Sequence, residues 1–121
     1  MESKLIDINE KIGLIEIYED LDAENATMLF HKTEGLFNLG VTDIILNLIE
    51  TNFMSHIAVA VIARTSKTCY RRKGQLSILY KNHLVFDLLA ITNLEKYINF
   101  YHSMEEAREK ISQNHRLQYD N

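Results

Sequence analysis

The sequence predicts an α/β protein in which one mixed sheet is covered by helices. Segments with the apolar content of strands alternate with segments that repeat apolar residues every three or four positions. The chain has 121 residues, a length typical of one domain, and contains no proline and no Gly/Ser-rich linker. We therefore expect a single domain over residues 1–121, with a core at about 4–112 and a polar tail at 113–121.

The first half of the chain predicts two strands, a helix and a buried strand. Residues 4–9 and 12–18 have strand-like apolar content and are separated by a two-residue turn. Asp22 fits a helix N-cap because its carboxylate can accept from free backbone N–H groups, and Gly40 fits the end of that helix. Residues 43–49, DIILNLI, are apolar on both faces, as expected for a central strand.

The second half of the chain continues with helices and strands in alternation. Its last helix begins at Ser103, which forms a capping box with Glu106 three residues later. The complete order is ββαβαβαβα. The elements of this half are expected at 56–72, 75–80, 83–92, 96–101 and from 103 onward.

Composition excludes several classes of function. The net charge is −4 and the pI is about 5.7, which argues against a nucleic-acid partner because such binding depends on many Lys and Arg contacts to phosphates. No apolar run is long enough to span a membrane, and the N-terminus, MESKLIDINE, lacks the features of a signal peptide. Cys69 is the single cysteine. We expect a cytoplasmic protein without direct membrane insertion.

No arrangement of residues indicates catalysis. The chain has no Gly-rich phosphate loop and no Cys-His or Ser-His-Asp set at a supporting spacing. The five histidines and Cys69 show no metal-ligand spacing. We therefore expect a protein that is not an enzyme and that needs no metal or cofactor.

Three stretches and the element order carry a resemblance to a known family. DLDAENA at 20–26 resembles its turn into the first helix, and ILNLIETNFM at 45–54 resembles its central strand. LLAITNLEKYINFYHSMEEA at 88–107 resembles its third helix, last strand and start of the last helix. On these stretches the chain resembles the STAS domain of bacterial anti-sigma-factor antagonists.

The resemblance implies a protein-binding module of transcription regulation. Such antagonists bind an anti-sigma factor, often a serine kinase related to histidine-kinase-like ATPases, which can phosphorylate a serine at the start of the second helix and so dissociate the complex. Without a gap, Ser55 falls where the family has an aspartate and His56 falls where it has the phosphorylated serine. The resemblance therefore implies partner switching without the usual serine.

The resemblance also implies where a partner would bind. The surface consists of the turn before the first helix and the start of the second helix. Its expected members are Asp20, Asp22, Glu24, Asn25, Thr51, Asn52, Met54, Ser55, His56, Ile57, Val59 and Ala60.

Several alternatives stay open at this point. Ser55 fits a helix N-cap, and it is also an alternative phosphoacceptor, shifted by one residue from the family position. His56 fits an ordinary surface residue, a partner contact or a phosphohistidine. The chain could also be an accessory subunit of a membrane transport complex or of a sensory assembly, and it could form a homo-oligomer.

A cluster of cations follows in the second half of the same helix. Its members are Arg64, Lys67, Arg71, Arg72 and Lys73. Cations near a helix C-terminus are favoured by the helix dipole, which accounts for them without a function. Docking to an acidic patch on a partner is the functional alternative.

Overall fold

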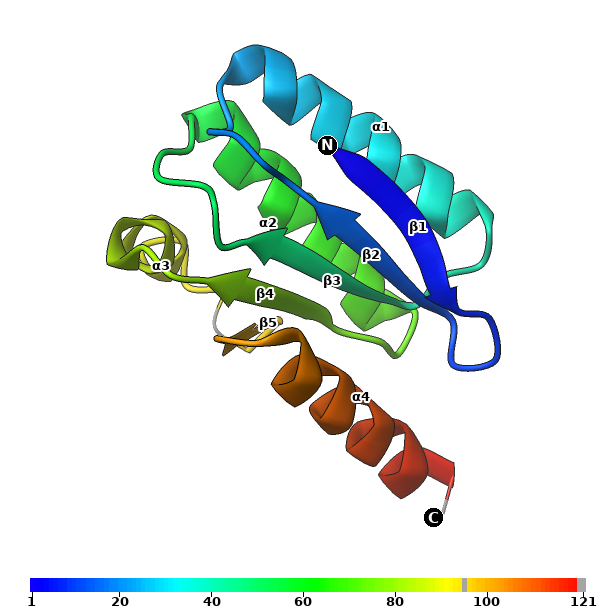
Figure 1. Ribbon diagram of the computed structural model, residues 1–121. Coiled ribbons are helices and arrows are strands. Elements are labelled where there is room, and N and C mark those ends of the chain that lie inside the picture. Colours follow the sequence, from blue (N-terminus) through cyan, green and yellow to red (C-terminus); the bar gives the residue numbers. More distant parts are fainter. Residues whose placement is uncertain (95, 120–121) are drawn as a thin grey trace.

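The computed structural model describes residues 1–94 and 96–119, with side chains as far as residue 114. In this part of the chain five strands and four helices follow the predicted order (Figure 1). The elements are β1 (Glu2–Asp7), β2 (Ile12–Glu16), α1 (Ala23–Asn38), β3 (Asp43–Leu48), α2 (His56–Arg71), β4 (Leu76–Tyr80), α3 (His83–Ala90), β5 (Ile98–Tyr101) and α4 (Met104–Tyr119).

The strands form one mixed sheet in the order β1-β2-β3-β4-β5. β1 pairs with β2 in antiparallel orientation, and the remaining neighbours are parallel. Helices α1 and α2 lie against one face of the sheet, and α4 lies on the opposite side (Figure 1). The predicted class, an α/β fold with helices packed on one mixed sheet, is confirmed.

The two faces of the sheet bury apolar side chains to different extents. The larger cluster joins the sheet to α1, α2 and α3, and it includes Ile44, Leu46, Ile62 and Leu89. The smaller cluster lies under α4, which contributes two buried residues. Its fully buried members are Ile12, Leu14, Ile45, Leu79, Ala107 and Ile111. β3 contributes to both clusters, as predicted for a central strand.

Several bounds differ from the sequence prediction. β1 runs from Glu2 to Asp7 rather than over 4–9, and β2 ends at Glu16 rather than at residue 18, because the chain leaves the sheet there to reach α1. The last helix, α4, continues to Tyr119 and so includes residues 113–119 of the expected polar tail; residues 120–121 lie outside the described part. Within the described residues, none of the helices has the length and apolar content needed to cross a bilayer.

Candidate functional site

The chain turns from β3 into α2 at the predicted Ser-His pair. Ser55 is the N-cap of α2, and its Oγ accepts a hydrogen bond from the backbone N–H of Ala58 at 3.2 Å. This bond satisfies one of the free N–H groups of the first turn. The Ser55 side chain is half-buried, whereas His56, the first residue of the helix, is exposed. The prediction of a cap at Ser55 is confirmed.

Backbone hydrogen bonds join the loop before α2 to the turn before α1. The N–H of Leu21 donates to the carbonyl of Phe53 at 2.9 Å, and the N–H of Ser55 donates to the carbonyl of Leu21 at 2.7 Å. Together they form a short parallel bridge between Leu21 and Met54. The two segments therefore form one continuous surface rather than two independent loops.

Side chains strengthen this connection. Asp20 Oδ1 accepts from the backbone N–H groups of Asn52 at 2.8 Å and Phe53 at 3.1 Å. The hydroxyl of Thr51 donates to the carbonyl of Glu19 at 3.1 Å. Charge-assisted bonds of the Asp20 type are stronger than those between neutral groups. Asp20 therefore fixes the conformation of the loop that leads into α2.

The turn before α1 contains a second cap. Asp22 Oδ1 accepts from the backbone N–H of Asn25 at 2.8 Å, so the predicted cap of α1 is confirmed. The Asn25 side chain donates to the carbonyl of Asp20 at 2.9 Å. Glu24 is exposed in the first turn of α1. Of these side chains, Glu24 is the one whose carboxylate points to solvent without a capping role.

Two members of the expected surface are interior. Thr51 is 0% exposed and its hydroxyl is bonded to the Glu19 carbonyl, and Met54 is 3% exposed and packs in the main core cluster. Their side chains cannot contact a partner in this structure, which corrects the sequence prediction for these two residues. Of the other expected members, the exposed ones are Asp20, Asp22, Glu24, Asn52, His56, Ile57 and Ala60, and the half-buried ones are Asn25, Ser55 and Val59.

Phe53 also belongs to this surface, although it is not among the expected members named above. It is 51% exposed, and Ile57 in the first turn of α2 is 52% exposed. Phe53 and its neighbour Asn52 are both exposed between the buried Thr51 and Met54, so a two-residue alternation does not predict which of them faces solvent. The N–H of Phe53 donates to Asp20, a contact that no local sequence pattern indicates.

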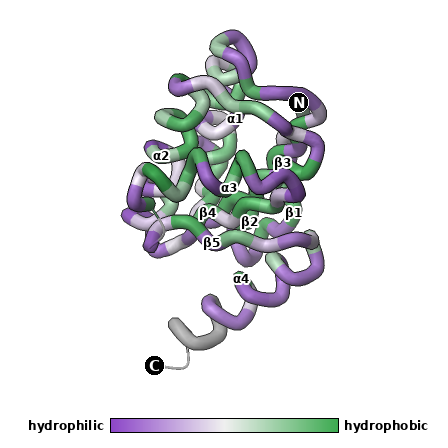
Figure 2. Tube along the Cα trace, turned by 90° about the vertical axis from the view of Figure 1, so that its left-hand side faces the viewer, coloured by the Kyte–Doolittle hydropathy of each residue, from purple (hydrophilic) through white to green (hydrophobic). Residues whose placement is uncertain are grey.

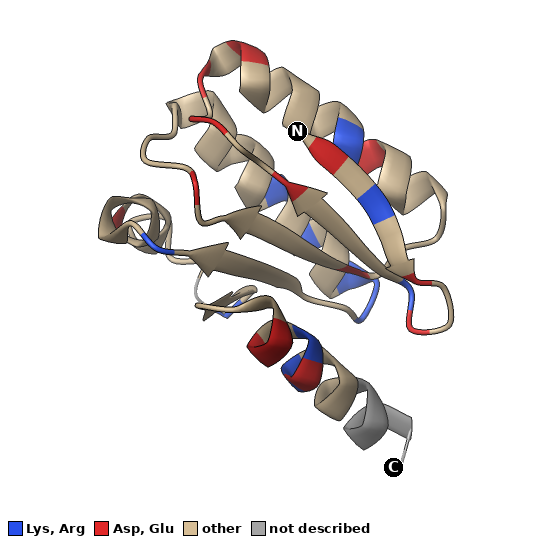
Figure 3. Cartoon of the chain, viewed as in Figure 1, with Lys and Arg blue, Asp and Glu red and all other residues tan. Residues whose placement is uncertain are grey.

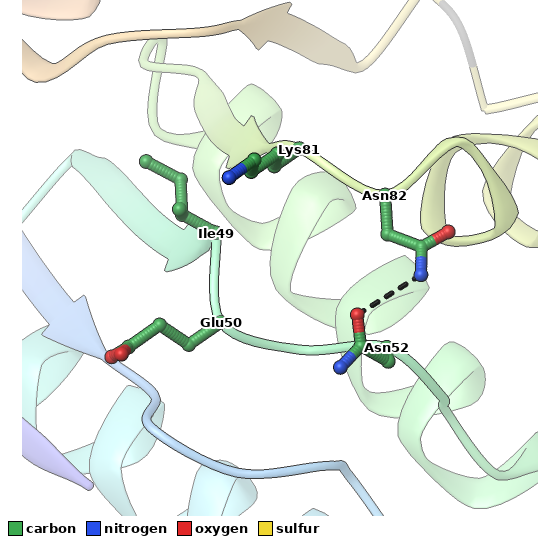
Figure 4. A pocket seen from close by; sticks show the side chains of 5 residues that line it. All are labelled: Ile49, Glu50, Asn52, Lys81 and Asn82. Carbon is green, nitrogen blue, oxygen red and sulfur yellow. Dashed lines mark hydrogen bonds between the residues drawn. The ribbon is translucent and has the colours of Figure 1, made fainter.

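An open hollow of about 400 Å³ adjoins the same surface (Figure 4). Its lining residues are Ile49, Glu50, Asn52, Lys81 and Asn82. The Asn82 Nδ2 donates to Asn52 Oδ1 at 3.0 Å, and Asn82 also caps α3. The hydrogen bond therefore joins the start of α3 to the loop before α2.

The surface lies in a negative electrostatic environment. Residues 12–31 and 33–63 contain no Lys or Arg, and acidic side chains lie at the start of α1, in the turn before it and in the loop before α2 (Figure 3). Nearby, the hydroxyl of Tyr18 donates to Glu16 at 2.9 Å. This bond raises the pKa of Tyr18 to about 12, with smaller contributions from desolvation and from the charges of Glu16, Glu2 and Glu50.

Neither a metal site nor an exposed thiol is present among the described residues. Among the described residues, no group of three or more His, Cys, Asp and Glu side chains is arranged to hold a metal ion. Cys69 is buried on α2, and burial raises the pKa of its thiol to about 12. A buried thiol of this kind is unreactive.

Comparisons with known proteins agree on one family. The model of the STAS domain matches residues 3–107. A Thermotoga neapolitana protein described as an anti-sigma factor antagonist, a homolog of TM1081, is 27% identical over 106 residues, which covers 86% of this chain and 93% of the relative.

Solved structures show the same fold. The anti-sigma factor antagonist TM1081 of Thermotoga maritima superposes with a TM-score of 0.80 at 22% identity, covering 92% of this chain and 93% of that chain. The phosphorylated form of the Bacillus cell fate determinant SpoIIAA superposes with a TM-score of 0.73 at 17% identity, covering 91% of this chain and 97% of that chain.

Proposed function

The chain belongs to the STAS domain family, and we propose that it acts as an anti-sigma-factor-antagonist-like regulator that binds a protein partner. Relatives in sequence and in structure carry the name anti-sigma factor antagonist. The partner is an anti-sigma factor or a related kinase-like ATPase protein, which places the action in the cytoplasm. The protein acts by binding rather than by catalysis.

The observation that carries this proposal is the fixed, exposed surface at the start of α2. Asp20 and the Leu21–Met54 bridge hold the loop in one conformation, with Phe53 and Ile57 half-exposed beside His56. A surface that is ordered before binding loses less conformational entropy when a partner docks. Exposed aromatic and aliphatic side chains on such a surface are suitable anchors.

We further propose that this surface lacks the serine phosphorylation switch. The resemblance places His56 at the position of the phosphorylated serine, and His56 has no hydroxyl. Ser55 has one, but its Oγ is half-buried and engaged with the N–H of Ala58. Phosphorylation of Ser55 would require that this cap first opens. Partner release is then controlled by other means, such as abundance.

A binding and phosphoryl-transfer experiment tests both proposals. Purified protein is titrated calorimetrically with a kinase-like anti-sigma factor from the source organism and then incubated with it and radiolabelled ATP. We expect binding without label, and we expect His56→Ser to become labelled. Ser103→Ala, which removes an exposed cap hydroxyl on α4, serves as the control.

Other outcomes are equally informative. Label that disappears in Ser55→Ala would establish the shifted acceptor, and label that persists there would establish a switch at another residue. Absence of binding would refute the antagonist function. Co-purification with a permease or transport ATPase subunit would instead favour the accessory-subunit alternative.

A further inference from the structure

The two edges of the sheet are built differently. β5, at one edge, has four residues, and Figure 2 shows it between α3 and α4. Phe86 of α3 packs against Phe100 of β5, with ring centroids 4.9 Å apart. Short or covered edge strands are common protections against pairing with another chain. β1, at the other edge, has six residues, and no strand in the described part of the chain pairs with its outer side (Figure 1).

Charges of opposite sign lie two residues apart on β1 (Figure 3). Glu2 and Lys4 are exposed, and they share one face of the sheet because successive side chains of a strand point to opposite faces. Neither forms an ion pair within the described residues. Charges on an edge strand usually hinder pairing with another chain, so the register decides whether these two charges oppose pairing or favour it.

The alternation of side chains restricts how two β1 strands can pair. Directly opposite residues of an antiparallel pair share one face, so a symmetric pair must be centred on a residue. The bulge between Leu5 and Asp7 ends the regular stretch and excludes centres farther along. Centring on Glu2 or on Lys4 places like charges opposite each other. Centring on Ser3 places Glu2 of each copy opposite Lys4 of the other.

The register centred on Ser3 also offsets a repulsion within each copy. Glu2 lies directly opposite Glu16 of β2, and like charges in this position destabilise a sheet. Lys4 of the second copy lies on the other side of Glu2 in this register. On the opposite face, Met1 lies opposite Leu5 of the second copy, and both residues pack against the main core cluster. Both faces of the pairing are therefore favourable.

We propose that a second copy of the chain docks on β1, edge to edge and antiparallel, with Ser3 of each copy at the centre and two Glu2–Lys4 ion pairs across the interface. The sheets of the two copies then form one continuous sheet. The paired stretch is short, so the interface is smaller than that of a permanent dimer, and its occupancy follows protein concentration.

This dimer goes beyond the proposed function and does not depend on it. The strands of the two copies run in opposite directions, so their candidate sites lie at opposite ends of the joined sheet. Each copy can therefore bind its own partner.

Sedimentation equilibrium over about a hundredfold range of protein concentration tests the dimer. We expect the average mass of the wild type to rise toward that of two chains. Glu2→Lys and Lys4→Glu should each raise the dissociation constant about tenfold, because each turns two attractive pairs into repulsive ones. Glu105→Lys and Lys110→Glu, at exposed positions of α4, are the matched controls. A wild type that stays monomeric throughout, or single variants that dimerise as well as their controls, would overturn the proposal.

Combined reversals test the register itself. The double variant Glu2→Lys with Lys4→Glu exchanges the two signs, and we expect it to dimerise like the wild type. An equimolar mixture of the two single variants should also dimerise, because each chain supplies the sign that the other lacks. Neither a change in net charge nor damage to the fold explains such a recovery. If neither sample recovers, the register centred on Ser3 is refuted.

Amide shifts locate the contact. ¹⁵N-labelled protein is diluted stepwise, and we expect shifts in residues 2–6 that Lys4→Glu abolishes. Shifts confined to residues 98–101 would assign the contact to the other edge of the sheet, and shifts confined to residues 52–60 would assign it to the candidate site. Either result would overturn the proposal. Added salt should weaken the dimer, because it screens exposed ion pairs, and equal association at high salt would exclude the Glu2–Lys4 pairs.

Discussion

The two ends of helix α2 use their polar and charged side chains in different ways. At the C-terminal end, Arg72 Nη1 donates to the carbonyls of Phe37 at 2.9 Å and Val41 at 3.1 Å. About two turns earlier, in the middle of α2, Arg64 pairs with Glu34 at 3.2 Å. These contacts attach α2 to α1 and to the segment that follows it. At this end the cations serve the fold.

Around the N-terminal end of α2, the exposed side chains and carboxylates are free to contact a partner. Phe53 and Ile57 are half-exposed, and among the described residues neither Glu24 nor Glu50 forms an ion pair. A run of five cations is the more conspicuous feature of the sequence, yet its best-placed members are engaged within the molecule. The contrast teaches that a cluster of like charges in the sequence indicates a partner surface only when its side chains make no contacts within the protein itself.

The largest expected effect concerns the reactivity of the Cys69 thiol. Cys69 lies near the cationic C-terminal end of α2, and its thiol would be activated if the nearby positive charges determined its pKa. Burial, followed by the charge of Asp43, raises the pKa of its thiol from 9.0 to about 12, although Arg72 lowers it. We expect the native thiol to react with a disulfide reagent about a thousandfold more slowly than the thiol of the urea-unfolded chain.

The same shift has a consequence for stability against pH. Because the folded pKa is raised, the contribution is complete below pH 9.0 and is lost as the pH rises toward about 12. Rapid reaction of the native thiol at neutral pH would contradict the prediction.

Gly74→Ala should give the next largest effect. Gly74 lies in the turn between α2 and β4, and a Cβ there would overlap the backbone carbonyl of Thr42, which cannot move without disturbing β3. We expect a loss of about 3 kcal/mol in the free energy of unfolding, measured by urea denaturation. Gly35→Ala is the matched control, because a Cβ at that exposed helical position meets nothing. It should stabilise by about 0.5–1 kcal/mol.

Arg72→Ala sharpens the contrast between the two ends. Loss of two hydrogen bonds and of the packing of the guanidinium over the Phe37 ring, 4.8 Å from its centroid, should lower stability by about 1–2 kcal/mol. Arg71→Ala, which loses a bond to the exposed Thr68 hydroxyl, should change it much less. Partner affinity should be unchanged in both. Weaker binding without loss of stability would assign the basic end to the interface.

Ser55→Ala has the smallest expected effect. Removal of the cap should lower the free energy of unfolding by about 1 kcal/mol, whereas Ser55→Asp should preserve it because both residues cap well. Thermal unfolding of the three proteins measures the difference. If alanine and serine were equally stable, the hydroxyl would not be held by the helix, and the case against its phosphorylation would weaken.

The fold could be predicted from the sequence because the helix caps and the apolar repeats indicated the same elements along the chain. Caps at Asp22 and Ser55 follow from residue type, and each lies beside an apolar repeat of the correct period. The boundary of β2 was less readable, because apolar residues continue past Glu16 while Ile17 and Leu21 are buried outside any strand. Residues that are buried outside a strand are as apolar as residues within one, so the apolar pattern alone does not show where the strand ends.

The candidate site could be predicted only in part, because contacts between distant segments of the chain decide which of its side chains are exposed. The exposure of Phe53 and the burial of Thr51 depend on bonds to Asp20 and Glu19, which lie about thirty residues earlier in the chain. These contacts join residues that are far apart in the sequence, so local spacing does not reveal them.

The sheet has a consequence for how the chain is made. Strand order in space is identical to strand order along the chain, so each strand leaving the ribosome finds its neighbour already synthesised. The second face of the sheet is covered later. Helix α4, which covers Ile12, Leu14 and Ile45 on that face, is translated last. A nascent chain therefore exposes that face until synthesis is nearly complete. Chaperone contact during translation should concentrate there.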